Sequence, residues 1–156
     1  MKNNAQYTAE QIAAWFLHHN DELVRDEGGD LISNLKLQKL LYYAQGCSLA
    51  INDQALFQEY IVAWRHGPVV ESIYHTFKRY GDGGIVYDDG IVTYNSRDID
   101  SNTVNLIEQV YEVFGKYSAW QLRNLTHQED PWKNTEQSDR IDLESIQQYF
   151  KDHYVT

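Results

Sequence analysis

The pattern of apolar positions near the start of the chain predicts a helix. Ile12, Trp15 and Phe16 fall on one face at helical spacing. Thr8 precedes them and has a glutamine three residues later, which is the spacing of a capping box. We therefore predict a first helix over 8–20.

The segment 21–30 is charged and ends in two glycines, which predicts a loop. From Ser33 or Asn34 to residue 52 the chain then has its strongest helical periodicity. We expect this second helix to be the central element of the core. The residues at helical spacing on its core-facing side are Leu37, Leu40, Leu41, Ala44, Ser48 and Ile51.

The middle of the chain combines turn signals with runs that favour β structure. Residues 60–64 are β-branched and aromatic, which predicts a short strand. Pro68 suits the first position of a third helix, which we expect to end near Gly81. In 85–94 two β-favouring runs flank an Asp-Gly pair at 89–90, a strong signal for a hairpin. Because an isolated hairpin is marginally stable, we expect it to pair with the 60–64 strand or to pack on helices.

Capping signals divide the last third of the chain into further helices. Ser101 predicts the start of a fourth helix that ends at Gly115, and Ser118 with Gln121 has capping-box spacing for a short fifth helix. Asp142 is expected to cap the last helix. The sequence therefore predicts a mainly α (α+β) fold, with five or six helices packed around a small antiparallel β element made of one short strand plus a hairpin.

The length of 156 residues suits one domain, so we expect a single domain over 1–156. Within it, 1–6 are expected to form a disordered tail. The sequence leaves open whether the C-terminal helix in 133–156 belongs to the motif-bearing core.

The composition is acidic, with 13 Lys and Arg against 23 Asp and Glu and a net charge of −10. A surface of this sign repels phosphate backbones and attracts basic proteins, so we expect no nucleic-acid binding. The single cysteine, Cys47, excludes an intrachain disulfide and a multi-cysteine zinc site. The chain has no signal-peptide pattern and no apolar run long enough to span a membrane, so we expect a cytoplasmic protein.

A catalytic interpretation of the sequence would start from two histidines. His66 lies beside a Gly-Pro turn, and His127 comes just before Glu129 and Asp130. If the fold joined them, one imidazole could act as a base oriented by a carboxylate. The sequence marks out no nucleophile, because Cys47 lies in an apolar helical run, and it lacks the common catalytic and phosphate-binding motifs. We therefore predict no catalytic residues, no metal and no cofactor, with a histidine-dependent hydrolase as the alternative.

Two segments are candidate surfaces for binding a partner. The acidic stretch in 21–30 can attract a basic protein, and the expected hairpin in 85–94 offers sheet edges and aromatic side chains. Lys36 and Lys39 share a helix face and are expected to pair with carboxylates. The residues that we predict to bind a partner are Asp26, Glu27, Asp30, Lys36, Gln38, Tyr87 and Asp88.

Three spaced motifs resemble those of a known family. Residues 34–46 read NLKLQKLLYYAQG, residues 63–70 read AWRHGPVV, and LTH at 125–127 is followed by Pro131-Trp132. In this order the chain is similar to the Panacea domain, the SocA-like antitoxin and phage-associated GepA-like group of bacteria and phages. The similarity runs from about Thr8 to the last of these motifs.

This resemblance implies a non-enzymatic antitoxin. Members of the family bind and neutralise toxins of different kinds encoded beside them, and some deliver the toxin to a cellular protease as adaptors. A cognate protein toxin is therefore the implied partner, with a phage-encoded regulator of a host protein as the alternative; no oligomeric state is implied. Because one domain meets unrelated toxins, the motif residues are expected to build the scaffold while variable surfaces choose the partner. The motif residues expected to be structural are Leu37, Leu40, Tyr42, Trp64, His66, Gly67, Pro68, Val69, Tyr74, Thr126, His127, Pro131 and Trp132.

Overall fold

The computed structural model describes residues 4–155. It is mainly helical with one two-stranded antiparallel sheet, which confirms the predicted fold class. These residues form seven α-helices, because a short helix that the capping signals did not predict follows the fifth. The elements are α1 (Ala9–Glu27), α2 (Asn34–Asn52), β1 (Val62–Trp64), β2 (Gly67–Val69), α3 (Glu71–Phe77), the 3₁₀ turn η1 (Lys78–Tyr80), α4 (Ser101–Phe114), α5 (Ala119–His127), α6 (Asp130–Lys133) and α7 (Leu143–His153).

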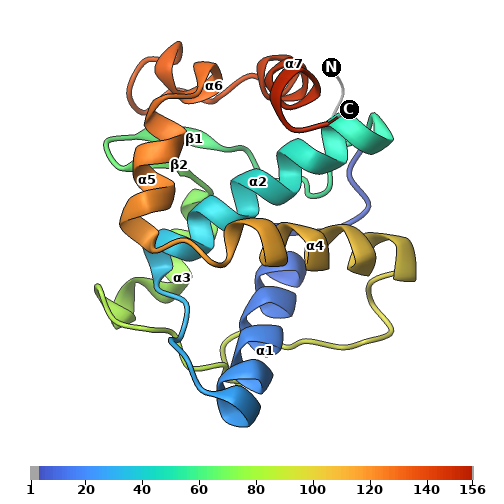
Figure 1. Cartoon of the computed structure of the whole chain (residues 1–156), viewed down its shortest axis with the longest axis vertical. Coiled ribbons are helices and arrows are strands. Elements are labelled where there is room, and N and C mark those ends of the chain that lie inside the picture. The colour runs from blue at the N-terminus through green and yellow to red at the C-terminus, as the bar shows by residue number, and fades with distance from the viewer. Residues whose placement is uncertain (1–3, 156) are drawn as a thin grey trace.

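Helix α2 is the central element, as predicted. Figure 1 shows it crossing the middle of the molecule, and α1, α4, α5 and α7 all pack against it. Ser33 caps it by accepting a hydrogen bond from the backbone N–H of Lys36. Ile51, which we placed among the apolar core positions, is 53% exposed. It lies in the last turn of the helix, at the rim of a shallow groove that it shares with Val113.

Helix α1 extends to Glu27, so the prediction of a loop over the whole of 21–30 is wrong. The acidic first residues of the predicted loop are helical. Asp21 and Arg25, one helical turn apart, form an ion pair of 3.1 Å that stabilises this part of the helix. The helix ends at Gly28, whose φ of 79° lies in the left-handed region that glycine adopts without strain.

The Gly-Pro turn forms a strand, and α3 begins only at Glu71, so the prediction that Pro68 starts a helix is wrong. Pro68 lies opposite Ala63 in the two-stranded sheet. Ala63 directs its backbone N–H and C=O away from β2, to the carbonyl of Asp139 and the N–H of Ser138. A proline is tolerated there because no ladder hydrogen bond needs its missing N–H.

The structure has no strand in 85–94, so the predicted hairpin is wrong, as is its pairing with 60–64. Asp88 organises this segment. Its carbonyl accepts hydrogen bonds from the N–H groups of Ile91 and Val92, and its carboxylate accepts one from Gly90. The Asp-Gly pair therefore belongs to a turn closed by hydrogen bonds to Asp88, and the residues on its two sides do not pair as strands.

Local capping signals located most helix starts. The capping boxes that begin at Thr8 and Ser118 are both present. The fourth helix is capped by Asp100, one residue before the predicted Ser101. Asp142 occupies the N-cap position of α7, although its side chain makes no capping hydrogen bond.

Helix α7 packs closely on α2. Its residues Ile146 and Phe150 are fully buried. Gly46 of α2 lies against the Phe150 ring, where an added Cβ would approach a ring carbon to 2.3 Å. At the other terminus, residues 1–3 of the expected tail lie outside the described residues, while the carbonyl of Asn4 accepts a hydrogen bond from Gln54. No helix within 4–155 is both long and apolar enough to cross a membrane.

Candidate functional site

A groove of about 560 Å³ lies between α1 and the loop that follows η1. Four carboxylates and one arginine line it, so its charge is negative. We call it the acidic groove. Its lining residues are His18, Asp21, Glu22, Arg25, Tyr80, Val86, Tyr87, Asp88 and Asp89.

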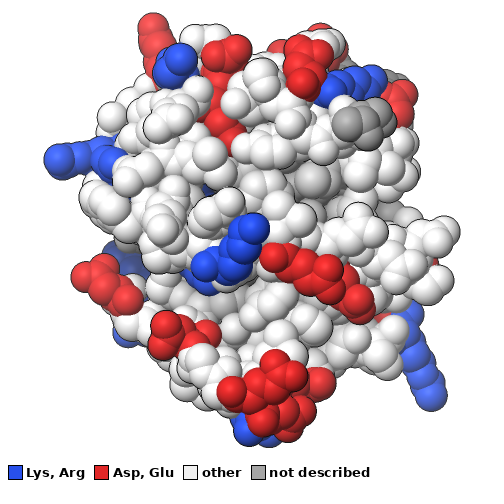
Figure 2. Space-filling model, in the orientation of Figure 1, with Lys and Arg blue, Asp and Glu red and all other residues white. Residues whose placement is uncertain are grey.

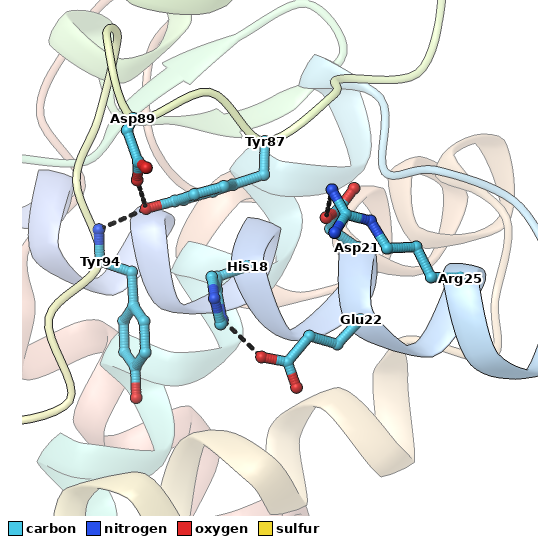
Figure 3. A network of polar contacts seen from close by, with 7 residues as sticks. All are labelled: His18, Asp21, Glu22, Arg25, Tyr87, Asp89 and Tyr94. Carbon is cyan, nitrogen blue, oxygen red and sulfur yellow. Dashed lines mark hydrogen bonds and ion pairs between the residues drawn. The ribbon is translucent and has the colours of Figure 1, made fainter.

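One wall of the acidic groove is a face of α1 on which polar side chains pair at a spacing of four residues (Figure 3). His18 Nδ1 lies 3.2 Å from a carboxylate oxygen of Glu22, four residues later. Asp21 pairs with Arg25 at the same spacing, and Asp21 is 9% exposed. The arginine therefore neutralises the more buried carboxylate, and Glu22 is left exposed as a negative group.

The opposite wall is held by Tyr87. Its hydroxyl donates to a carboxylate oxygen of Asp89 at 2.6 Å and accepts from the backbone N–H of Tyr94 at 2.7 Å, as Figure 3 shows. The His18 ring stacks on Tyr94, with 4.6 Å between centroids, and meets the Tyr87 ring edge-on. These ring contacts join the loop to α1 and fix the shape of the groove.

The structure separates the seven predicted partner-binding residues into several places. Tyr87 and Asp88 line the acidic groove. Glu27, Asp30 and Lys36 line a second hollow of about 440 Å³, between the end of α1 and the α4–α5 connection. Figure 2 shows acidic side chains gathered over the end of α1, where Asp26, Glu27 and Asp30 are exposed.

His18 is a groove residue that the sequence interpretation passed over. The usable signal was the spacing of four between His18 and Glu22, which places both on one helix face.

Both motif lysines of α2 donate to backbone carbonyls. Lys36 Nζ bonds to the carbonyl of Gly115, and Lys39, which is fully buried, bonds to the carbonyl of Pro68 at 3.0 Å. Neither forms an ion pair with a carboxylate in 4–155, so the expected pairing is wrong. Burial lowers the pKa of Lys36, and burial together with the positive charge of Arg123 lowers the pKa of Lys39 to about 7.

Gln38, which lies beside Lys39 in the same motif of α2, is 1% exposed. Its amide donates to Asn34, and its carbonyl oxygen accepts from the backbone N–H of Val70 at 2.9 Å. From α2, Lys39 thus bonds the central residue of β2, Pro68, and Gln38 bonds Val70, the residue just after the strand. The apolar motif residues Leu37, Leu40 and Tyr42 are completely buried.

The two motif histidines do not form a base with an orienting carboxylate. His66 is exposed, and its Nδ1 accepts a hydrogen bond from Arg123 at 3.3 Å. The His127 ring stacks on Trp132 with 3.9 Å between centroids. The pKa of each histidine is lowered. Burial is the largest cause for both, and the positive charge of Arg123 is the second.

The carboxylate expected to orient a histidine is used elsewhere. Glu129 is 1% exposed and accepts hydrogen bonds from the hydroxyls of Tyr42 and Tyr43, both at 2.9 Å, and of Tyr154. Burial raises the pKa of Glu129 despite these three donors. This buried cluster joins α2 to the start of α6 and the end of α7, and sequence analysis did not anticipate it.

The thiol of Cys47 is half-buried, and burial raises its pKa to about 12. A thiol in this state is a poor nucleophile at neutral pH. Within 4–155, no three His, Cys, Asp or Glu side chains lie where they could hold a metal ion together.

Comparisons with known proteins found a matching family and a related protein. The model of the family described as Antitoxin SocA-like, Panacea domain, matches residues 37–133. Antitoxin SocA of Caulobacter vibrioides (strain NA1000 / CB15N) is 34% identical over 109 residues, which is 65% of this chain and 58% of that protein. The chain therefore spans less than two thirds of the length of that relative. No solved structure matches the chain. Since the family match covers more than half of the chain, from α2 to the end of α6, this protein belongs to the SocA-like Panacea-domain antitoxin family.

Proposed function

We propose that this protein neutralises a cognate protein toxin, encoded next to it, by binding the toxin directly. Its membership of the SocA-like Panacea family carries the proposal. The structure supports it, because Gln38, Lys39 and the apolar motif residues are used inside the fold. Because these residues are buried, the contacts that distinguish one toxin from another must come from exposed side chains.

The acidic groove and the neighbouring end of α1 are the proposed contact surface. Asp26, Glu27 and Asp30 are exposed there, and Tyr87 with Asp88 forms the far wall of the groove. Such a surface accelerates association with a basic partner and opposes association with an acidic one. The half-buried Lys36 lies at its margin, and Gln38 contributes from inside by holding the fold.

The proposed action is not enzymatic. His66 is paired with an arginine and His127 with a tryptophan ring, while Glu129 is enclosed by tyrosine hydroxyls. These groups stabilise the fold through their contacts, and binding alone suffices for neutralisation.

Co-expression with the adjacent open reading frame tests the proposal. We expect that product to arrest growth alone, and this chain to restore growth and to co-purify with it. A harmless neighbour, or one that this chain neither binds nor neutralises, would overturn the proposal.

Charge reversal tests the surface separately from the function. Changing Asp26, Glu27 and Asp30 together to lysine should slow association with the toxin by about tenfold or more at low salt, and by less at high salt. If it leaves the association rate unchanged, the acidic surface is not the route of approach. The matched control reverses three exposed carboxylates elsewhere, Asp98, Glu112 and Asp152.

Delivery of the toxin to a protease is a finer prediction that the family resemblance implies. It is tested by following the toxin's half-life in cells with and without this chain. A shorter half-life in its presence would support an adaptor role, and an unchanged one would leave neutralisation by binding alone.

A further inference from the structure

A cavity of about 340 Å³ lies between α2, the β1–β2 turn, α3 and the start of α5. Three aromatic side chains, Trp64, Tyr74 and Trp120, form much of its wall together with Leu35 and Val69. The volume is near the lower limit for ligand pockets, which suits one large side chain with its adjoining backbone. The acidic groove shares none of the lining residues of this cavity.

Hydrogen bonds and ring contacts hold the walls of this cavity in place. Tyr74 meets Trp64 edge-on, with 4.9 Å between centroids, and its carbonyl accepts a hydrogen bond from Asn34 at 3.0 Å. Gln38 bonds both Asn34 and the backbone N–H of Val70. A ligand would therefore meet a preformed site and lose little free energy in ordering these side chains.

The rim of the cavity is cationic, although the chain carries a net charge of −10. Arg65 and Lys78 line it, and Arg123 lies over the face of Trp120 at 4.5 Å. Within the described chain, none of these three cations forms an ion pair with a carboxylate, and the lining includes a single carboxylate, Asp82. Three cations beside one carboxylate leave positive charge available for an outside partner.

Trp120 is the most accessible aromatic residue of the rim, with 54% of its surface exposed. Tryptophan, tyrosine and arginine are the residue types most enriched among the strong contacts of protein interfaces. Here all three kinds line a single cavity, which contains two tryptophans together with Tyr74 and Arg65. The composition therefore favours a protein segment as its ligand.

We propose that this cavity binds a segment of a partner protein that carries an aromatic side chain next to an aspartate or a glutamate. The ring enters between Trp64 and Trp120, where edge-on or offset contacts with indole rings are available. The carboxylate accepts charge-assisted hydrogen bonds from Arg65, Lys78 or Arg123 at the rim. Only the identification of this partner as the toxin rests on the proposed function.

Short peptides test the chemistry of the cavity without any toxin. The probes are three blocked pentapeptides, Gly-Asp-Phe-Glu-Gly, Gly-Lys-Phe-Lys-Gly and Gly-Asp-Ala-Glu-Gly, added to the full chain while the indole N–H signals of its four tryptophans are recorded by NMR. The first peptide should shift the Trp64 and Trp120 signals. It should bind at least about tenfold more tightly than the other two, a difference of about 1.4 kcal/mol. Equal binding of the lysine peptide, or shifts at the other tryptophans only, would overturn the proposal.

Variants at exposed rim positions identify the groups responsible. Arg65→Glu with Lys78→Glu, and separately Trp120→Ala, should each weaken the first peptide by about tenfold or more. Unchanged peptide binding in these variants would overturn the proposal. The matched control, Arg97→Glu with Lys151→Glu, makes the same charge change at exposed positions outside the cavity and should bind the peptide as the unaltered chain does.

The toxin itself then separates this inference from the proposed function. If the toxin binds the cavity variants at least tenfold more weakly, the cavity is part of the toxin interface. If co-expression shows neutralisation but the cavity variants bind the toxin with unchanged affinity, the antitoxin function stands and the cavity is excluded from that interface.

Discussion

The β1–β2 turn, taken together with the strand that follows it as residues 65–70, and the loop in 85–94 are both short segments with β-favouring sequences. They are held in place in different ways. The turn is fixed from inside, by Lys39 and Gln38 of α2, which bond the backbone at Pro68 and Val70. The loop is closed largely by its own side chains, through Asp88 and Tyr87 at its surface.

This difference indicates where substitutions can be accepted. A change in the turn disturbs the hydrogen bonds of polar groups that are buried away from water, so its cost spreads into the core. A change in the loop removes contacts that water can replace. One scaffold can therefore keep its interior while its exposed loop varies with the partner.

The largest effect is expected for Gly67→Ala, which adds a methyl group inside the turn. Gly67 has a φ of 111°, and a Cβ there would lie 2.7 Å from Lys39 Cε and 2.8 Å from Thr126 Oγ1. Strain and overpacking together should lower the free energy of unfolding by about 3 kcal/mol. Chemical denaturation measures it.

Gly29→Ala is the matched control, because Gly29 has the same φ of 111° but nothing within 4 Å of an added Cβ. It should lower the free energy of unfolding by about 1 kcal/mol, from backbone strain alone. Equal losses in the two variants would show that the contacts with Lys39 and Thr126 do not fix the turn.

Glu129→Leu should be almost as costly, because it leaves the buried hydroxyls of Tyr42 and Tyr43 without their acceptor. We expect a loss of about 3 kcal/mol in the free energy of unfolding. Glu129→Gln keeps an acceptor at the same place and should cost about 1 kcal/mol. If both variants unfold at the same denaturant concentration, the tyrosine cluster contributes through packing and not through its hydrogen bonds.

Lys39 should make stability depend on pH. The pKa of Lys39 is lowered to about 7 in the fold, from an ordinary value of 10.5. Between these two pH values the unfolded chain therefore keeps a proton that the folded chain has lost. The free energy of unfolding should therefore rise with pH across this window, by at most about 1.4 kcal/mol per pH unit, and the gain is lost as the pH falls. Lys39→Met removes this dependence, so the difference between the two proteins isolates it. Parallel pH profiles would contradict a depressed pKa.

The sequence predicted those parts of the fold that local signals determine. Ser33, Thr8 and Ser118 cap their helices through side chains only three residues from their targets, and α2 shows its apolar positions directly. The site was harder to predict, because its contacts join distant residues. In the acidic groove the His18 ring stacks on Tyr94, more than seventy positions later in the chain. Inside the fold, the hydroxyls of Tyr42 and Tyr43 reach Glu129 across more than eighty positions.

The same reason explains the errors. Pro68 has the local signal of a helix start, but Lys39, buried beside it, holds it in a strand. The Asp-Gly pair at 89–90 has the signal of a hairpin, but the Asp88 carboxylate accepts a hydrogen bond from the N–H of Gly90 in the turn, and the flanking residues do not form strands. In both places hydrogen bonds of a polar side chain determine the backbone conformation. Composition and periodicity do not reveal such bonds.

The smallest effect is expected in the loop, for Tyr87→Phe. The variant loses the hydroxyl that bonds Asp89 and the N–H of Tyr94, but it keeps the ring beside His18. Since both bonds lie near the surface, the cost should be about 1 kcal/mol or less, which lowers Tm by roughly 2–4 °C for a domain of this size. Tyr60→Phe, at an exposed ring, is the control.

Hydrogen exchange at the Tyr94 amide of the Tyr87→Phe variant should accelerate while exchange in α2 stays unchanged, because the loop opens without unfolding the core. Faster exchange in α2 would contradict the contrast between loop and turn, since it would make the loop part of the cooperative core.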